Sequence, residues 1–143
     1  MTPYPFKVTH TVTFRDLDVL GHVNNSVYFT WFETARVGYM ASLLKLDDPR
    51  AVPIILGETS CRFRAPGQWG DTIEIGCGIS RFGAKSLDMI YRVATTSDRL
   101  LATGTSVLVY YDYASQRSIA VPDEFRQRVA AFQGKWQPPA NER

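Results

Sequence analysis

The chain has 143 residues, a formal net charge of +2 at pH 7, 45% hydrophobic residues and 21% charged residues. A chain of this length is expected to form one domain, 1–143, and to bury about 70% of the surface that it exposes when unfolded. The composition excludes an intrinsically disordered protein, and the small net charge gives no support for a nucleic-acid surface.

The sequence also indicates a cellular compartment and a role for the two cysteines. No stretch approaches the about 18 apolar residues of a membrane span, and the N-terminus lacks the charged start and apolar run of a secretion signal. We therefore expect a cytoplasmic protein. Cys61 and Cys77 have neither CxxC spacing nor a neighbouring histidine, which predicts buried thiols rather than a metal site or a redox pair.

The N-terminal third combines a strand with a long helix. Apolar and polar residues alternate from Phe6 to Arg15, which predicts a half-buried strand with His10 on its apolar face as a hydrogen-bonded core or interface residue. A polar turn follows, and then a helix over Val27 to Leu44 whose apolar stripe is wide enough to need cover on several sides. Asn24 or Asn25 suits the N-cap of this helix.

The remainder of the chain is mostly strand. We expect strands over Pro53 to Phe63, Thr72 to Ser80, Leu87 to Val93 and Leu100 to Asp112, a short helix with Pro122 at its first position, and a frayed tail from Gln137. The last strand is apolar on both faces, as expected of a strand covered on both sides. Short links between strands predict antiparallel, meander-like pairing.

These elements predict an α+β fold. A flat sheet cannot cover so apolar a helix on several sides, so the economical arrangement is a curved antiparallel sheet wrapped around the helix. The outer face of the sheet and one of its edges would remain free. Such an edge favours pairing with another chain, which indicates a homodimer or a larger assembly.

Two common catalytic or phosphate-binding motifs are excluded. The chain has no Gly-x-Ser-x-Gly elbow, so a serine-triad hydrolase is not expected. The stretch Gly78–Ser86 resembles a P-loop, but Ala84 stands where that motif needs glycine and a strand follows where it needs a helix. Arg81, Lys85 and Ser86 could still hold a phosphate or nucleotide; the alternative is a solvated hairpin turn.

The polar turn before the long helix is the best candidate for chemistry. Asp16 and Asp18 lie close to a helix start, where free backbone N–H groups carry partial positive charge. Such groups can stabilise an oxyanion that forms on a bound carbonyl, and a nearby carboxylate can act as general base or nucleophile. The alternative is that both aspartates only shape the turn through hydrogen bonds to the backbone.

The turn and the helix start resemble the signature of the 4-hydroxybenzoyl-CoA thioesterase-like family of hotdog-fold proteins. The matching residues are Asp18-x-x-Gly21-His22-Val23-Asn24-Asn25-x-x-Tyr28, with Glu33-x-Ala35-Arg36 downstream. Weaker likeness in Arg64-Ala-Pro66, Gly70-Asp71 and Lys85-Ser86 extends the match from Val12 to about Pro122. The resemblance implies a hotdog fold, in which five antiparallel strands wrap around one helix.

The resemblance also implies an activity and an assembly. Members of the family hydrolyse acyl-CoA thioesters without a metal or a bound cofactor. Their active sites lie between the two subunits of a homodimer, and dimers often assemble into homotetramers. An acyl-CoA substrate is therefore expected to contact two copies of the chain.

The family's functional residues map onto specific positions of this sequence. Asp18 matches the catalytic carboxylate, which attacks the thioester carbonyl or activates water. Asn25 matches the helix-start residue whose backbone N–H polarises that carbonyl, and Asp16 is expected to be structural. Tyr28 belongs to the aromatic residues toward which the acyl group would point, together with Trp31 and Phe32.

Five further residues are expected to contact the substrate. Arg81, Lys85 and Ser86 match the region that holds the phosphates or the pantetheine arm of CoA. Thr59 and Ser60, on the strand after the helix, would reach the active site of the other subunit.

Three residues have roles that the resemblance leaves open. His22 stands where the best-known members that act on aromatic acyl groups have an apolar residue, and a structural role or proton transfer is open to it. Some hotdog thioesterases use a glutamate on the helix, where this chain has Glu33; pairing with Arg36 is the alternative. Glu58, on the following strand, is a further candidate base.

Two rival functions share the expected fold. One is a non-hydrolytic module that binds acyl-CoA or an acyl carrier protein, against which the carboxylate at Asp18 argues. The other is a hydratase or dehydratase, for which the four-residue spacing between Asp18 and His22 does not fit. The length and aromatic character of the acyl group do not follow from the sequence.

Overall fold

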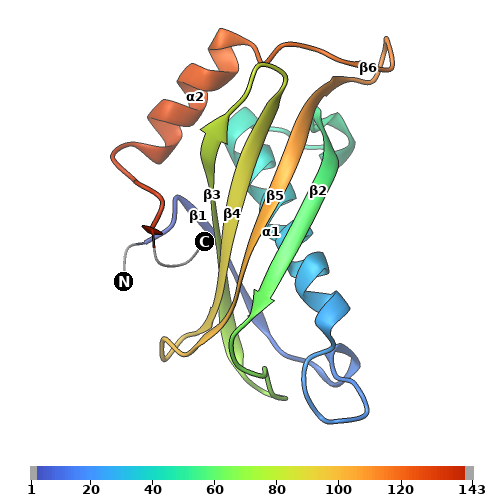
Figure 1. Ribbon diagram of the computed structural model, residues 1–143, viewed down its shortest axis with the longest axis vertical. Coiled ribbons are helices and arrows are strands. Elements are labelled where there is room, and N and C mark those ends of the chain that lie inside the picture. Colours follow the sequence, from blue (N-terminus) through green and yellow to red (C-terminus); the bar gives the residue numbers. More distant parts are fainter. Residues whose placement is uncertain (1–2, 141–143) are drawn as a thin grey trace.

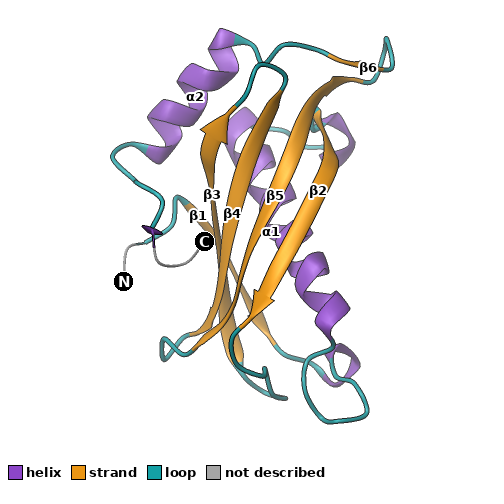
Figure 2. Cartoon of the chain, viewed as in Figure 1, coloured by secondary structure: helices purple, strands orange, loops and turns teal. Residues whose placement is uncertain are grey.

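The computed structural model describes residues 3–140. Its elements in chain order are β1 (Phe6–Thr11), the 3-10 turn η1 (Phe14–Asp16), α1 (Asn25–Leu44), the 3-10 turn η2 (Pro49–Ala51), β2 (Ile54–Phe63), β3 (Thr72–Phe82), β4 (Ser86–Thr95), β5 (Leu100–Asp112), β6 (Arg117–Ser118) and α2 (Asp123–Gln133). A curved sheet forms one layer and α1 crosses its concave face (Figure 1). The predicted α+β hotdog fold is confirmed, including the short C-terminal helix (Figure 2).

The strand order is β1-β3-β4-β5-β2, and the two-residue β6 pairs with the end of β5. All pairs in the sheet are antiparallel. The meander-like prediction is correct for β3, β4 and β5 but wrong for β2, which lies beside β5 at the far edge. The connector after β2 passes the end of the β4–β5 hairpin, where the Arg64 N–H donates to Leu101 O at 2.7 Å. This connector separates β2 from β3.

The first strand is shorter than predicted. Alternation suggested a strand to Arg15, but β1 ends at Thr11. The chain then turns through η1, where the Asp16 carboxylate accepts hydrogen bonds from the backbone and the hydroxyl of Thr13. This local capping interaction competes with the extended conformation and ends the strand.

The long helix ends at Leu44 as predicted and begins at Asn25, two residues before the predicted Val27. Asn24 is the N-cap, because its side chain accepts from Ser26 N at 2.9 Å, and Lys45 closes the helix in the left-handed conformation with φ 55°. The helix packs closely on the sheet at one point, where the ring of Phe32 leaves no room for a Cβ on Gly104. A larger residue than glycine at position 104 would force the Phe32 ring to move.

The C-terminal helix covers the outer end of β3. Pro122 is its N-cap rather than its first residue, and the Gln133 amide bonds both backbone groups of Ile79 and the Tyr39 hydroxyl. Of the tail expected to fray from Gln137, residues 141–143 lie outside the described part of the chain. Within residues 3–140, neither helix is long and apolar enough to cross a membrane.

Candidate active site

A small hairpin carries Asp18. Leu17 and Val23 form a bridge, and within it the Asp18 N–H donates to His22 O at 2.9 Å. Gly21 N donates to Asp18 O, and Gly21 has φ 80°, a conformation that favours glycine at the tip of such a turn. The hairpin therefore holds Asp18 at a defined point directly before α1.

The Asp18 carboxylate retains acceptor capacity. Its Oδ1 accepts from Leu20 N at 2.9 Å, and the side chain is neither deeply buried nor fully exposed. A carboxylate has about four acceptor positions, so one backbone bond leaves it able to orient a water molecule or meet a carbonyl carbon. By contrast, Asp16 Oδ2 accepts from the backbone and the hydroxyl of Thr13 and also contacts His10 of β1.

The start of α1 presents backbone donors beside this carboxylate. The Asn24 side chain and backbone accept from Ser26 N and Val27 N, so these N–H groups are satisfied. Asn25 is exposed and is the first residue of the helix. Its N–H has no intrahelical acceptor and points along the positive end of the helix dipole.

One pocket brings the two predicted catalytic residues together. It has a volume of about 360 Å³ and lies between the hairpin, the start of α1 and the end of β2. Its lining includes Asp18, His22, Asn25, Tyr28, Phe63 and Arg64. We refer to it as the Asp18 pocket.

Tyr28 forms the buried wall of this pocket. Its side chain is 2% exposed, and its ring meets the ring of Phe63 edge-on with centroids 5.3 Å apart. Burial raises the pKa of Tyr28 above its ordinary value, although a backbone hydrogen bond with Gly67 opposes the shift. The hydroxyl therefore stays protonated at neutral pH. The other predicted aromatics lie elsewhere: Trp31 lines a different pocket and Phe32 is buried against Tyr91.

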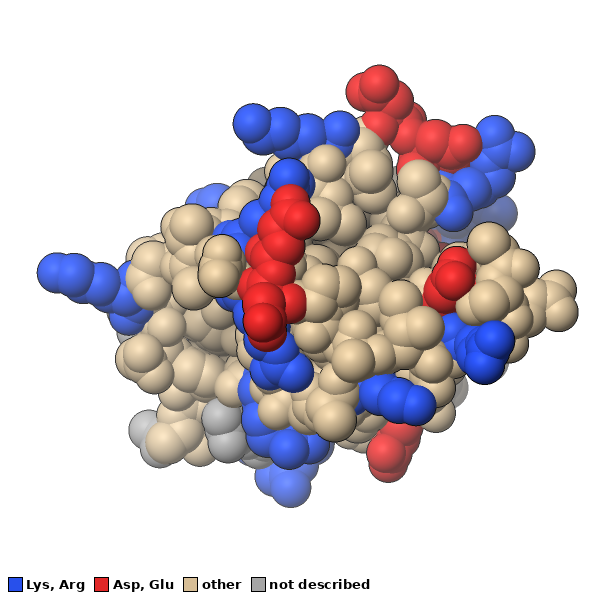
Figure 3. Space-filling model, turned by 90° about the horizontal axis from the view of Figure 1, so that it is seen from above, with Lys and Arg blue, Asp and Glu red and all other residues tan. Residues whose placement is uncertain are grey.

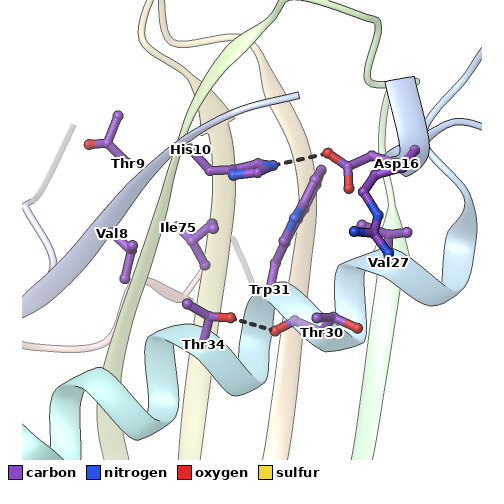
Figure 4. Close-up of a pocket in the computed structure, with 10 residues that line it drawn as sticks. Val8, Thr9, His10, Asp16, Val27, Thr30, Trp31, Thr34 and Ile75 are labelled. Atoms are coloured by element: carbon purple, nitrogen blue, oxygen red, sulfur yellow. Dashed lines mark hydrogen bonds and ion pairs between the residues drawn. The ribbon is translucent and has the colours of Figure 1, made fainter. Parts of the chain in front are cut away.

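Asp16 holds the turn in place, as predicted for a structural residue. His10 of β1 points toward it across Trp31, with Nε2 3.0 Å from Asp16 Oδ2 (Figure 4). Asp16 O also accepts from Asn24 N at 2.8 Å. Partial burial alone would raise the pKa of Asp16, but hydrogen bonds from His10 and Thr13 outweigh it and lower the pKa. The prediction that His10 is a hydrogen-bonded residue is confirmed.

The predicted phosphate-binding residues lie at the other end of the sheet. Arg81, Lys85 and Ser86 flank the β3–β4 link, whereas Thr72 at the start of β3 pairs with Thr11 close to the Asp18 hairpin (Figure 1). The eleven residues of β3 separate these ends, a distance of about 33 Å at the usual rise of a strand. One chain therefore does not bring the two sets of residues together.

Charges at this far end are mixed. Arg81 Nε lies 3.0 Å from Asp88 Oδ2, with the arginine side chain 66% exposed. Figure 3, which views the molecule from above, shows basic and acidic side chains interspersed rather than a single basic patch. A phosphate here would meet separate cations and not a broad positive surface.

Thr59 and Ser60 do not line the Asp18 pocket. Thr59 Oγ1 lies 3.0 Å from Ser106 Oγ, which accepts from Tyr91, and Ser60 Oγ lies 2.8 Å from Thr105 Oγ1. The hydroxyls of Thr59 and Ser60 thus both have hydrogen-bond partners on β5. Within one chain these residues stabilise the pairing of β2 with β5.

The two glutamates named as alternatives also lie away from Asp18. Glu33 and the buried Arg36 line a separate pocket of about 410 Å³, with Glu33 Oε2 3.9 Å from Arg36 Nη2. Glu58 is exposed on β2 and does not line the Asp18 pocket. Neither glutamate is close to the helix start that supplies the N–H donors.

The structure adds residues that sequence reasoning had not assigned. Arg64, Phe63 and Leu20 line the Asp18 pocket. Arg64 stood in the Arg64-Ala-Pro66 motif, but its place depends on where the connector runs. Among residues 3–140 there is no group of three or more His, Cys, Asp or Glu side chains suited to hold a metal ion.

Comparisons with known proteins agree with this architecture. The model of the thioesterase-like superfamily matches residues 12–129. A thioesterase from Thermus thermophilus, solved with coenzyme A and Zn, is 30% identical with a TM-score of 0.86, and the match covers 95% of this chain and 99% of that chain.

Two further relatives are more distant. A 1,4-dihydroxy-2-naphthoyl-CoA thioesterase from Synechocystis is 20% identical with a TM-score of 0.75, over 87% of this chain and 95% of that chain, which indicates a shared fold. The uncharacterized protein YsmA of Bacillus subtilis (strain 168) is 23% identical over 128 residues, 90% of this chain and 87% of its own length.

Proposed function

Because the chain belongs to the thioesterase-like superfamily, we propose that it hydrolyses an acyl-CoA thioester to the free acid and coenzyme A. The observation that carries the proposal is that Asp18 and the helix-start residue Asn25 line one pocket. A carboxylate and an oxyanion-binding N–H are together sufficient for a general-base or nucleophilic route to thioester hydrolysis. The CoA bound to the Thermus relative supports the same substrate class.

Asp18 supplies the reactive carboxylate in this proposal. As general base it takes a proton from water while the water oxygen bonds to the thioester carbonyl carbon. As nucleophile its own oxygen forms that bond, and water then hydrolyses the resulting anhydride. In both routes the carbon–sulfur bond breaks and the CoA thiolate leaves and is protonated.

Asn25 acts through its backbone. The thioester oxygen gains negative charge as the tetrahedral intermediate forms, and the Asn25 N–H at the positive end of α1 donates to it. Loss of one such donor in other enzymes costs about 10²-fold to 10³-fold in rate. Tyr28 and Phe63 form an apolar wall, within the same pocket, for the acyl group.

A homodimer completes the site in this proposal, and assembly of two dimers into a homotetramer would use a further face. Arg81, Lys85 and Ser86 lie far from Asp18 in one chain, so these residues would reach the CoA of a neighbouring copy. Thr59 and Ser60 lie on β2, an edge strand of the sheet, from which they would reach the active site of that neighbour. The substrate would then span two chains.

The test is a hydrolysis screen over acyl-CoAs of graded length and aromatic character. Release of the CoA thiol is followed with a thiol reagent for the wild-type protein and for Asp18→Asn. We expect turnover of at least one acyl-CoA by the wild type and its loss in the variant, with CoA binding retained. CoA binding without hydrolysis of any thioester would instead identify a binding module.

A further inference from the structure

A second cavity lies on the β1 side of α1. It has a volume of about 450 Å³, and its walls come from β1, η1, α1 and Ile75 of β3. It shares no lining residue with the Asp18 pocket. We refer to it as the His10 pocket. The proposed hydrolysis assigns no role to this cavity.

Apolar side chains form one part of the His10 pocket. Figure 4 shows Val8 of β1, Ile75 of β3 and Trp31 of α1 around the space between β1 and α1. Trp31 is 5% exposed, and its ring centroid lies 5.6 Å from that of His10. A cavity of about 150 Å³ is enough for a benzene ring. The His10 pocket therefore has room for a short alkyl chain or an aromatic ring together with a polar group.

The His10 imidazole brings a polar group to this apolar space. Its Nε2 lies 3.0 Å from Asp16 Oδ2, and the lowered pKa of Asp16 keeps that carboxylate ionised at neutral pH. An ionised carboxylate only accepts hydrogen bonds, so Nε2 carries a proton. Within residues 3–140 the other ring nitrogen, Nδ1, has no hydrogen-bond partner. The imidazole therefore has one nitrogen available to a ligand.

Asp16 fixes the orientation of this imidazole. Its Oδ2 also accepts from the backbone and the hydroxyl of Thr13, and its backbone O accepts from Asn24 N at the start of α1. The carboxylate that holds His10 is thus itself held by two other segments of the chain. A binding group that is oriented before the ligand arrives loses less conformational entropy on binding.

The charges at the His10 pocket fit one singly charged anion. Arg15 lines the pocket, is exposed and has no ion pair with a described residue. It is the only Lys or Arg among the described residues that line the pocket. A carboxylate matches a guanidinium in geometry and charge. A phosphate, with nearly two negative charges, would face the Asp16 carboxylate without a second cation from Lys or Arg.

We propose that the His10 pocket binds a small apolar carboxylate. The alkyl chain or aromatic ring of the ligand lies against Trp31. Its carboxylate accepts from Arg15 and from the protonated His10 imidazole, which donates from Nδ1 while Nε2 donates to Asp16. This site goes beyond the proposed function and does not rest on it, because the Asp18 pocket contributes no residue to it.

NMR of the tryptophan indole N–H groups tests where the ligand binds. Octanoate is titrated into isotope-labelled protein, whose three tryptophans give three such signals, and Trp31→Phe identifies the Trp31 signal. We expect that signal to shift with a midpoint of about 1 mM or lower, as is usual for a ligand of about ten non-hydrogen atoms. Trp69 follows Gln68, which bridges His22 of the Asp18 pocket, so binding in that pocket would shift the Trp69 signal instead.

Matched variants test the carboxylate contacts. Arg15→Gln should weaken octanoate binding about tenfold, whereas Arg117→Gln, the same change at an exposed position of β6, should leave it unchanged. His10→Gln keeps an N–H for Asp16 but removes Nδ1, and should weaken binding about threefold to tenfold. Thr34→Phe, at an exposed position of α1 that lines the pocket, should fill it and abolish binding. Melting temperatures equal to that of wild type are the control for folding.

Octanol separates a carboxylate site from a merely apolar cavity. It has the chain of octanoate without the charge and should bind about tenfold more weakly. The inference is overturned if the Trp31 signal does not shift at about 10 mM octanoate, if octanol binds as tightly as octanoate, or if Arg15→Gln binds as tightly as wild type. The titration is repeated with Asp18→Asn, in which the same Trp31 shift is expected. That shift in a wild-type protein that hydrolyses no acyl-CoA would overturn the proposed function and support the His10 pocket.

Discussion

The two ends of the sheet differ in how their polar residues are used. At the Asp18 end, a hairpin and a helix start converge on one pocket, and the Asp18 carboxylate accepts from Leu20 N alone among the described residues. At the β3–β4 end, Arg81 is paired with Asp88, and Arg126 donates to Gly83 O of the link. One end has a carboxylate with free acceptor positions, and the other has cations held by its own chain.

The difference indicates a division of roles. Bond breaking in the proposed reaction needs a reactive group near oxyanion donors, and at the Asp18 end Asp18 and Asn25 line one pocket. Phosphate binding needs exposed cations, and the Arg81 side chain at the β3–β4 end is 66% exposed although it is paired with Asp88. About 33 Å of strand separates the two ends within one chain, so the proposed function requires a second copy of the chain to bring them to one substrate.

The largest expected effect comes from changing Asp18. Asp18→Asn keeps an oxygen that can accept from Leu20 N, so the hairpin should fold as before, but it removes the base or nucleophile. We expect kcat to fall by about 10²-fold to 10⁴-fold, measured by thiol release under saturating acyl-CoA. An unchanged melting temperature is the control. A kcat within a few fold of wild type would remove Asp18 from the mechanism.

Reversing charge at the opposite end should act on binding. Arg81→Glu combined with Lys85→Glu is expected to raise KM for acyl-CoA about tenfold with little change in kcat, because in the proposed function these cations would contact the phosphates and not the reacting carbon. The difference from wild type should shrink as salt is added. Arg117→Glu on β6 is the matched control. A change in kcat with KM unaltered would contradict the division of roles.

Asp16 should matter less than Asp18, through positioning. Asp16→Asn weakens the contacts with His10 and Thr13, and we expect kcat to fall about threefold to tenfold with KM unchanged. The pKa of Asp16 is lowered from its ordinary value of 3.8, so its stabilising contribution is complete above that value and is lost as the pH falls below it.

Urea unfolding measures this contribution. Wild type should lose more unfolding free energy than Asp16→Asn between pH 5 and an acidic pH below 3.8. Equal losses in the two proteins would show that Asp16 makes no such contribution.

The smallest effect is expected at Glu33. It lines the pocket of Arg36 and not the Asp18 pocket, and its contact with Arg36 is 3.9 Å long with the glutamate 67% exposed. Glu33→Gln should therefore keep kcat and KM within about twofold of wild type, since exposed ion pairs contribute little. A loss of kcat comparable to that of Asp18→Asn would transfer the catalytic role to the helix.

Local patterns predicted most of the fold. The end of α1 at Leu44 and an N-cap at one of two adjacent asparagines follow from sequence patterns, and alternation or apolar, β-rich runs located the strands β1 to β5. The position of β2 did not follow, because strand pairing depends on the path of the connector through Arg64 and not on alternation. The end of β1 was missed because the Thr13–Asp16 capping contact ends a strand whose alternation continues.

The site was predictable in a different way. The motif located Asp18, Asn25 and Tyr28, and the fold brings these residues to one pocket. Arg64 was not assigned, because its approach to the pocket depends on tertiary structure. The distance of Arg81 and Lys85 from Asp18 could not be predicted either, because it depends on the length and direction of β3 in the folded chain.

Subunit complementation tests the central claim most directly: each site is built from Asp18 of one chain and the β3–β4 link of another. Asp18→Asn chains and chains carrying both Arg81→Glu and Lys85→Glu are co-expressed, and mixed dimers are assayed at low acyl-CoA concentration. In a mixed dimer one site has every wild-type group. With random pairing, about a quarter of the wild-type activity should return, well above the mean of the two parent proteins. Activity no greater than that mean would contradict a site shared between two chains.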